Sequence, residues 1–100
     1  DWPSIDGVYT KLQEEAGELQ TAVSPQHQAE ELGDLLFVTV NLAKWLDIDA
    51  ESALREANAK FSRRFRALEK LAEVRQLTLS EMDLDSLESL WQEVKQSAEA

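Results

Sequence analysis

Glycine and proline, the residues that most often end or interrupt a helix, are scarce in this chain, which has three glycines and two prolines among 100 residues. The stretches between them are rich in Ala, Leu, Glu, Lys, Arg and Gln, which lose least on entering a helix. With 43% apolar residues, a chain of this length suffices for one small domain with a core. The sequence therefore predicts an all-α bundle of four helices, in a single domain that spans residues 1–100.

Apolar residues recur every three or four positions along four segments, as one buried helix face requires. The helices are expected at about residues 5–23, 25–46, 50–74 and from 84 onward. Residues 1–4 are expected to form an extended lead-in, because a proline at position 3 disfavours helix before it. Residues 96–100 are expected to form a frayed tail. The chain begins without a methionine, so a fragment of a longer protein is one interpretation.

A very short connection around Ser24 and Pro25 should make the first two helices antiparallel neighbours. From Leu35 onward, in "LLFVTVNLAKWL", the second of these helices is apolar nearly all round. An isolated domain of this size would leave part of that surface in water. We therefore expect a second copy of the chain to cover it, which predicts a homodimer.

The formal charge of −10 argues against a sequence-independent grip on duplex nucleic acid, since such binding depends on Lys and Arg that neutralise phosphates. The absence of cysteine excludes disulfides and thiolate metal sites. No apolar run approaches the roughly 20 residues of a membrane span, and no charged-then-apolar leader precedes the first helix. A cytoplasmic protein without a membrane partner is the expectation.

Two pairs of carboxylates lie beside the apolar faces of the first two helices. Glu15 and Glu18 stand at i, i+3 on the first helix, and Glu31 and Asp34 stand at i, i+3 on the second. If the helices pack through these faces, four carboxylates converge, and their repulsion and lost hydration need a compensating positive charge. Oxygen ligands suit Mg²⁺, with Mn²⁺ as a substitute. The pattern therefore favours a magnesium and phosphate site.

The plainer interpretation of these carboxylates is a set of solvated helix faces. Twenty acidic residues produce E-x-x-E spacings by chance, although two pairs on adjacent helices are less easily explained in that way. A carboxylate-bridged iron site would need E-x-x-H on its helices. The only histidine, His27, forms no such motif, and we assign it no role.

Basic and aromatic residues in the second half of the chain are candidate nucleotide contacts. Lys60 and Arg64 stand at i, i+4 and can hold phosphates, or they can simply pair with nearby acidic residues. Trp91 and Lys95 have the same spacing. An indole can stack on a nucleobase while the ammonium contacts ribose or phosphate, but a tryptophan at this spacing is often a core residue. The other two tryptophans are interpreted as core.

Four segments together resemble the MazG family of nucleoside triphosphate pyrophosphohydrolases, in particular the C-terminal domain of the two-domain bacterial form. They are "KLQEEAGEL", "EELGDLLFVTVNLAKWL", "ALREANAKFSRRFRALE" and "LWQEVK". The resemblance runs from about Trp2 to Lys95, and this combination of motifs is highly specific. It implies an all-α fold, paired chains, and Mg²⁺-dependent cleavage of a nucleoside triphosphate into the monophosphate and pyrophosphate.

The resemblance also implies roles for individual residues. The metal ligands would be the four carboxylates of the two acidic motifs, namely Glu15, Glu18, Glu31 and Asp34. The residues that contact the nucleotide would be Lys60 and Arg64 at the phosphates or sugar, and Trp91 and Lys95 at the base and ribose. Glu14 and Glu30 match further acidic positions, and either would help to position water. The position four before Glu31, often basic in the family, is His27 here, and the connection between the acidic helices is shorter than in some relatives.

A non-catalytic helical module for dimerisation or regulation is the alternative function. Both interpretations predict a dimer, and they differ in whether Mg²⁺-dependent release of pyrophosphate occurs. The sequence leaves several properties undetermined: the base and sugar preference, the number of metal ions, the water-activating group and the physiological role.

Overall fold

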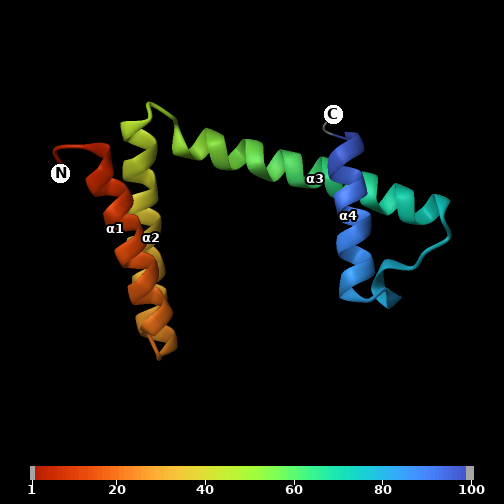
Figure 1. Cartoon of the computed structure of the whole chain (residues 1–100), viewed down its shortest axis with the longest axis horizontal. Helices are drawn as coiled ribbons and strands as arrows, with labels where there is room; N and C mark the ends of the chain where they lie inside the picture. The colour runs from red at the N-terminus through yellow and green to blue at the C-terminus, as the bar shows by residue number, and fades with distance from the viewer. Residues whose placement is uncertain (1, 99–100) are drawn as a thin grey trace. The chain divides into compact units, whose positions relative to one another are not determined.

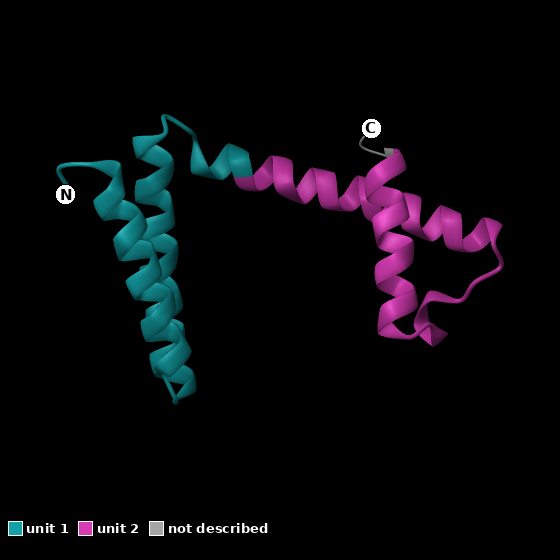
Figure 2. Cartoon of the chain, in the orientation of Figure 1, with its two compact units in different colours: residues 1–53 teal, residues 54–100 magenta. Residues whose placement is uncertain are grey.

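The computed structural model describes residues 2–98 and contains four α-helices in this range (Figure 1). They are α1 (Ile5–Thr21), α2 (Pro25–Trp45), α3 (Ala50–Val74) and α4 (Leu84–Ala98), with a short 3-10 turn, η1 (Leu79–Glu81), before α4. No strand occurs among the described residues, so the predicted all-α class is confirmed. The chain divides into two compact units, Asp1–Ala53 and Leu54–Ala100 (Figure 2). The assignment of residues 1–100 to one domain stays a prediction.

The connection between α1 and α2 depends on Ser24 and Pro25. Ser24 has extended backbone angles, φ −103° and ψ 149°, and its hydroxyl accepts a hydrogen bond from the backbone N–H of His27 at 3.1 Å. Pro25 occupies the first helical position, where its missing N–H leaves no bond unmade. The cap and the proline act as the sequence predicts, and α1 and α2 lie side by side in opposite directions (Figure 1).

Helix α1 ends at Thr21, two residues before its predicted end, because Ala22 already has extended backbone at ψ 133°. Val23, the last apolar residue of the predicted helix, is 91% exposed, whereas its neighbour Ala22 is buried. At the other end, residues 2–4 precede the helix as a lead-in, and Ser4 is extended as predicted. Residue 1 lies outside the described residues.

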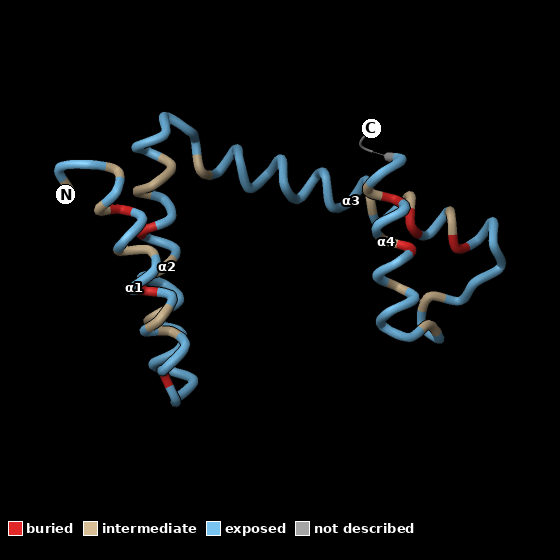
Figure 3. Tube along the Cα trace, viewed as in Figure 1, coloured by how far each residue is buried: buried red, intermediate tan, exposed pale blue. Residues whose placement is uncertain are grey.

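The first unit has a thin core between α1 and α2, in which Val8, Ala22 and Val38 are buried together with one charged residue, Glu15 (Figure 3). Much of the apolar surface of α2 remains exposed within the chain. Trp45 is 43% exposed, so its assignment to the core is wrong for the single chain. Trp45 remains exposed because α2 is apolar on nearly all of its faces and α1 can cover only one of them.

The second unit has its core where α4 crosses the C-terminal part of α3, with Leu68, Ala72, Leu90 and Val94 buried. Further apolar side chains pack against this core, namely Ala67, Leu71, Leu79, Met82 and Trp91. Asp83 caps α4 by accepting a hydrogen bond from the Ser86 N–H at 2.7 Å. A two-pronged ion pair between Arg75 and Glu93, at 2.9 and 2.7 Å, ties the end of α3 to α4.

Residues 96–98 of the predicted frayed tail belong to α4, which continues to Ala98, and the fraying of these residues stays a prediction. Buried Val94 anchors the last turns, and the Ser97 hydroxyl donates a hydrogen bond to the carbonyl of Glu93 at 3.1 Å. Residues 99–100, the rest of that tail, lie outside the described residues. Among the helices of the described range, none combines the length and the apolar character that a membrane crossing requires.

Two helices, α2 and α3, are each followed by a residue that has left-handed backbone angles although it is not glycine. These residues are Asp47 at φ 57° and Gln76 at φ 58°. After α3, the Leu77 N–H donates to the Ala72 carbonyl at 2.8 Å and the Gln76 N–H donates to the Glu73 carbonyl at 3.1 Å. This is the Schellman ending of a helix, in which glycine is the preferred residue at the left-handed position. Both endings therefore carry backbone strain that a glycine would relieve.

Gln76→Gly should raise the free energy of unfolding by about 0.5–1 kcal/mol. A left-handed backbone costs a residue with a side chain about 1–2 kcal/mol, and glycine removes this cost. Part of the benefit is lost, because glycine gives up more conformational entropy on folding. Urea unfolding followed by circular dichroism measures the change. The matched control is Lys70→Gly at an exposed position inside α3, which should lower the free energy of unfolding by about 1 kcal/mol. Equal destabilisation by both changes would contradict this account of the helix end.

Candidate metal site

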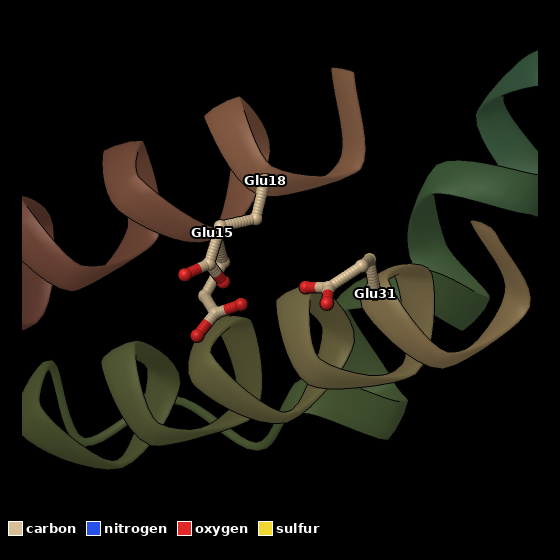
Figure 4. Close-up of side chains that lie close together, drawn as sticks. All are labelled: Glu15, Glu18 and Glu31. Carbon is tan, nitrogen blue, oxygen red and sulfur yellow. The ribbon is translucent and has the colours of Figure 1, made fainter. Parts of the chain in front are cut away.

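Three of the four predicted ligand carboxylates lie together between α1 and α2. Glu15 and Glu18 from α1 and Glu31 from α2 each offer an oxygen atom, and these atoms all lie within 4.8 Å of one another (Figure 4). The fourth, Asp34, is exposed and does not belong to this group. Its side chain is one methylene shorter than that of glutamate, and it begins about one helical turn beyond Glu31. Its role as a ligand stays a prediction.

Burial distinguishes Glu15, and in part Glu31, from a solvated helix face, whereas Glu18 is exposed. Glu15 is only 6% exposed, and its Oε2 atom is buried without a hydrogen-bond partner. Glu31 Oε2 is also buried without a partner. A carboxylate oxygen that has lost its water and gained no donor costs free energy, and a bound cation would remove that cost. The oxygen-only ligand set fits a divalent cation such as Mg²⁺ or Mn²⁺.

The other oxygen, Oε1, of Glu15 and of Glu31 has a partner one helical turn earlier. Lys11 Nζ lies 3.2 Å from Glu15 Oε1 and 3.9 Å from Glu14 Oε1, and His27 Nε2 lies 3.1 Å from Glu31 Oε1. Neither of these two contacts was predicted from the sequence. The signal that could have found them was present, because each basic residue stands four positions before its carboxylate.

The carboxyls of Glu15 and Glu18 titrate as a pair. A hydrogen bond with Glu15, followed by the negative charge of Glu15, raises the pKa of Glu18 above its ordinary value. The same hydrogen bond, followed by the one with Lys11, lowers the pKa of Glu15. The contact with Glu15 in turn raises the pKa of Lys11. When the pair holds a single proton, that proton therefore resides on Glu18.

The two candidates for positioning water, Glu14 and Glu30, are exposed and do not belong to the carboxylate group. Glu14 turns outward next to Lys11, with a side chain that is 58% exposed. Each is the chain neighbour of a buried carboxylate, Glu15 or Glu31, and so points in a different direction along the helix. Their proposed roles stay predictions.

The predicted nucleotide contacts lie in the second unit, where the two motifs that carry them meet. Phe61 of α3 lies between Phe65, with ring centres 6.0 Å apart, and Trp91 of α4, at 5.5 Å. On the same helices, Lys60 is exposed, and Arg64 and Lys95 are partly buried.

An apolar groove of about 280 Å³ opens beside these rings, lined by Phe61, Phe65, Leu68, Leu84, Leu87, Glu88 and Trp91. Trp91 thus combines the two interpretations drawn from the sequence, since it packs on the core and also forms a wall of the groove. The two phenylalanines were not predicted to line a groove, although their i, i+4 spacing places them on one helix face.

Without metal, the parent chain should lose stability as the pH rises through the raised pKa of Glu18. Between the pKa of Glu18 in the unfolded state and its higher pKa in the folded state, the folded chain holds a proton that the unfolded chain has released. The stabilisation from this proton is therefore complete below the unfolded pKa of about 4.3 and disappears above the folded pKa. The lowered pKa of Glu15 affects stability in a lower pH range, where the stabilisation by the ionised Glu15 carboxylate is lost as the pH falls.

Glu18→Gln should flatten this profile, because an amide donates to Glu15 at every pH. Thermal unfolding in a chelator, followed by circular dichroism from about pH 5 to about pH 8, measures the slope. Glu69→Gln on the exposed face of α3 is the control and should keep the parental slope. A Glu18→Gln profile that runs parallel to the parent would show that the pair does not share a proton.

Comparison with known proteins identifies the family of the chain. Residues 4–68 match the family model described as the MazG nucleotide pyrophosphohydrolase domain. The "Nucleoside triphosphate pyrophosphohydrolase/pyrophosphatase MazG" of Thermotoga maritima is 45% identical over 95 residues, which cover 95% of this chain and 37% of the relative. The "Nucleoside triphosphate pyrophosphohydrolase" of Escherichia coli K12 is 46% identical over 100 residues, covering 95% of this chain and 38% of the relative.

A third relative, the "Uncharacterized protein YabN" of Bacillus subtilis, is 40% identical over 67 residues, which cover 67% of this chain and 14% of that protein. The chain therefore spans well under half the length of the relatives it matches. The family match covers more than half of the chain and includes both acidic motifs on α1 and α2. The chain belongs to the MazG nucleotide pyrophosphohydrolase domain family.

Proposed function

We propose that this chain hydrolyses nucleoside triphosphates to nucleoside monophosphate and pyrophosphate with the help of a divalent cation. The observation that carries the proposal is the pair of buried, unpartnered oxygens, Glu15 Oε2 and Glu31 Oε2, on facing helices of a MazG-family domain. The relatives from Thermotoga maritima and Escherichia coli carry the corresponding names. A house-cleaning or nucleotide-pool role is the cellular function that we infer.

Mg²⁺ is the cation we propose, with Mn²⁺ as a substitute. Glu15, Glu18 and Glu31 would hold it with their clustered oxygens, and Asp34 is the proposed fourth ligand. A bound cation would neutralise the triphosphate and help water to attack phosphorus. The ligand oxygens are suited to this task because Lys11 and Glu18 keep Glu15 ionised: their hydrogen bonds lower its pKa.

The reaction needs no covalent intermediate. The oxygen of a water molecule forms a bond to the α-phosphorus, and the bond from that phosphorus to the oxygen bridging to the β-phosphorus breaks with pyrophosphate as the leaving group. The water proton passes to a carboxylate and then to solvent. Glu14 and Glu30, exposed next to the buried ligands, are the proposed acceptors that position this water.

The substrate contacts that we propose follow the motifs of the second unit. Lys60 and Arg64 on α3 would bind the phosphates or the sugar, because their cationic groups match the oxygens of a triphosphate. Trp91 would stack on the base, and Lys95, one turn later on α4, would contact the ribose region. A tryptophan face accepts every base, so these contacts give no strong base preference.

Incubating the chain with a nucleoside triphosphate, Mg²⁺ and ¹⁸O-water should release monophosphate and pyrophosphate in equal amounts, with the label in the monophosphate. Separation of the products and mass spectrometry measure both quantities. A chelator should stop the reaction, because the carboxylates alone repel the triphosphate. Failure to release any pyrophosphate, across a panel of canonical and modified nucleotides, would favour the non-catalytic helical module.

The matched variants of this experiment are Glu15→Gln and Glu31→Gln, which remove one charge each and keep the size of the side chain. Both should abolish Mg²⁺-dependent turnover and the thermal stabilisation by Mg²⁺, with helical content unchanged. Glu69→Gln, on an exposed face of α3, should behave as the parent. Turnover at the parental rate in the Glu15→Gln, Glu31→Gln double variant would show that the site is assigned to the wrong residues.

We also propose that two copies of the chain associate through α2. Leu36 and Phe37 are 58% and 70% exposed, and other large apolar side chains on this helix are exposed as well, namely Leu32, Val40 and Trp45. A surface of this kind on a small protein is commonly an interface. A cytoplasmic location and the lack of binding to duplex nucleic acid stay predictions.

Phe37→Glu should convert a dimer into a monomer, because it places a charge in the middle of the proposed contact. Light scattering coupled to size-exclusion chromatography measures the mass. Val23→Glu makes the same chemical change at a position that is 91% exposed in the loop before α2, and it should leave the dimer intact. A monomeric parent chain, or a Phe37→Glu variant that remains dimeric, would rule out this interface.

A further inference from the structure

We propose that His27 is a positioning residue of the cation site, which holds one oxygen of Glu31 so that the other is left for the cation. This proposal rests on the cation site of the proposed function. It concerns a residue that belongs to neither acidic motif and to which the sequence analysis assigned no role.

The contact that supports the proposal joins two neighbouring turns of α2. His27 Nε2 lies 3.1 Å from Glu31 Oε1, while the Oε2 atom of the same carboxylate is buried without a partner. The Glu31 side chain is 15% exposed, whereas that of His27 is 52% exposed. The imidazole is therefore the more exposed partner of this contact, and the carboxylate of Glu31 faces those of Glu15 and Glu18 (Figure 4).

The facing helix has the same arrangement, which argues against a chance contact of His27. Lys11 Nζ lies 3.2 Å from Glu15 Oε1, and Glu15 Oε2 is buried without a partner. In both helices, a donor four residues before the carboxylate holds Oε1, and Oε2 is left without a donor. Two carboxylates from different helices are thus oriented in the same way toward one cluster.

The backbone of His27 is itself held in place. Its N–H donates to the Ser24 hydroxyl at 3.1 Å, and this bond belongs to the cap that starts α2. The cap fixes the first turn, the first turn carries the imidazole, and the imidazole holds Glu31. A positioning group is effective when its own position is determined in this way.

The chemistry of the contact requires no change of protonation. An ionised carboxylate can only accept hydrogen bonds, so the imidazole must donate from Nε2. The neutral tautomer with hydrogen on Nε2 does so, and the imidazolium does as well. The proposed role is therefore to fix the rotamer of Glu31, and a side-chain amide that reaches the same oxygen can replace the ring.

The expected effect is on metal affinity in the absence of nucleotide. Loss of a group that orients a metal ligand typically weakens binding about 10–100-fold. We expect His27→Ala to weaken Mg²⁺ binding about tenfold, near the lower limit because the contact is partly exposed. If His27 instead contacts only the phosphates of the substrate, its loss would raise the KM for the nucleotide and leave the metal affinity unchanged.

The test uses the full chain without nucleotide and measures Mg²⁺ binding by calorimetry and by thermal stabilisation, with circular dichroism as the check of folding. His27→Ala should bind about tenfold more weakly than the parent, and His27→Gln should stay close to the parent. A glutamine makes a bond across one helical turn in α4, where Gln92 donates to Glu88 at 2.8 Å, although there the donor follows the carboxylate by four residues. Gln26→Ala, at an exposed neighbouring position, should bind as the parent does.

The outcomes separate the two proposals. Parental affinity in His27→Ala, together with loss of binding in Glu31→Gln, would overturn the role of His27 and leave the cation site standing. Parental affinity in Glu31→Gln would overturn the site itself and with it the role of His27. Weak binding by both His27→Ala and His27→Gln would also overturn the proposal, because the amide retains the donor that the positioning role requires.

Discussion

The burial of the Glu15 carboxylate against α2 is the constraint on which the rest of this site depends. At 6% exposure, the carboxylate has lost most of its water, and Lys11 supplies a partner for only one of its oxygens. A hydrophobic side chain at this position would suit a helix pair better, since an incompletely paired buried charge is destabilising. The first unit therefore gives up stability at the place where a cation can bind, and binding returns it.

The elements that local chemistry determines were predictable from the sequence. The start of α2 follows from Ser24 and Pro25, because a cap and a proline at the first helical position specify a helix start on their own. The meeting of Glu15, Glu18 and Glu31 follows from their position beside the apolar stripes of two adjacent helices. The family resemblance is confirmed by the match over residues 4–68, although it does not test the individual roles.

What the sequence could not determine depends on packing between elements. Val23 fits the apolar stripe of α1 as well as Ala22 does, and only the extended backbone after Thr21 decides which of them is buried. Asp34 has the same spacing from Glu31 as Glu18 has from Glu15, yet it is exposed and does not belong to the group. Periodicity likewise shows that Trp45 lies on an apolar helix without showing that this face remains exposed.

The distribution of charge along the chain explains why the two groups of proposed contacts are chemically different. Residues 1–53 contain eleven acidic and two basic side chains, whereas residues 54–100 contain nine and eight. A triphosphate is repelled by the first set, and no rearrangement of side chains there can change the sign of the field. In the proposed reaction, attraction of the substrate to the carboxylates would therefore come from a bound cation, while the basic residues of α3 would contact phosphate oxygens directly. The proposed activity would therefore need both the cation and the basic helix, because each supplies what the other lacks.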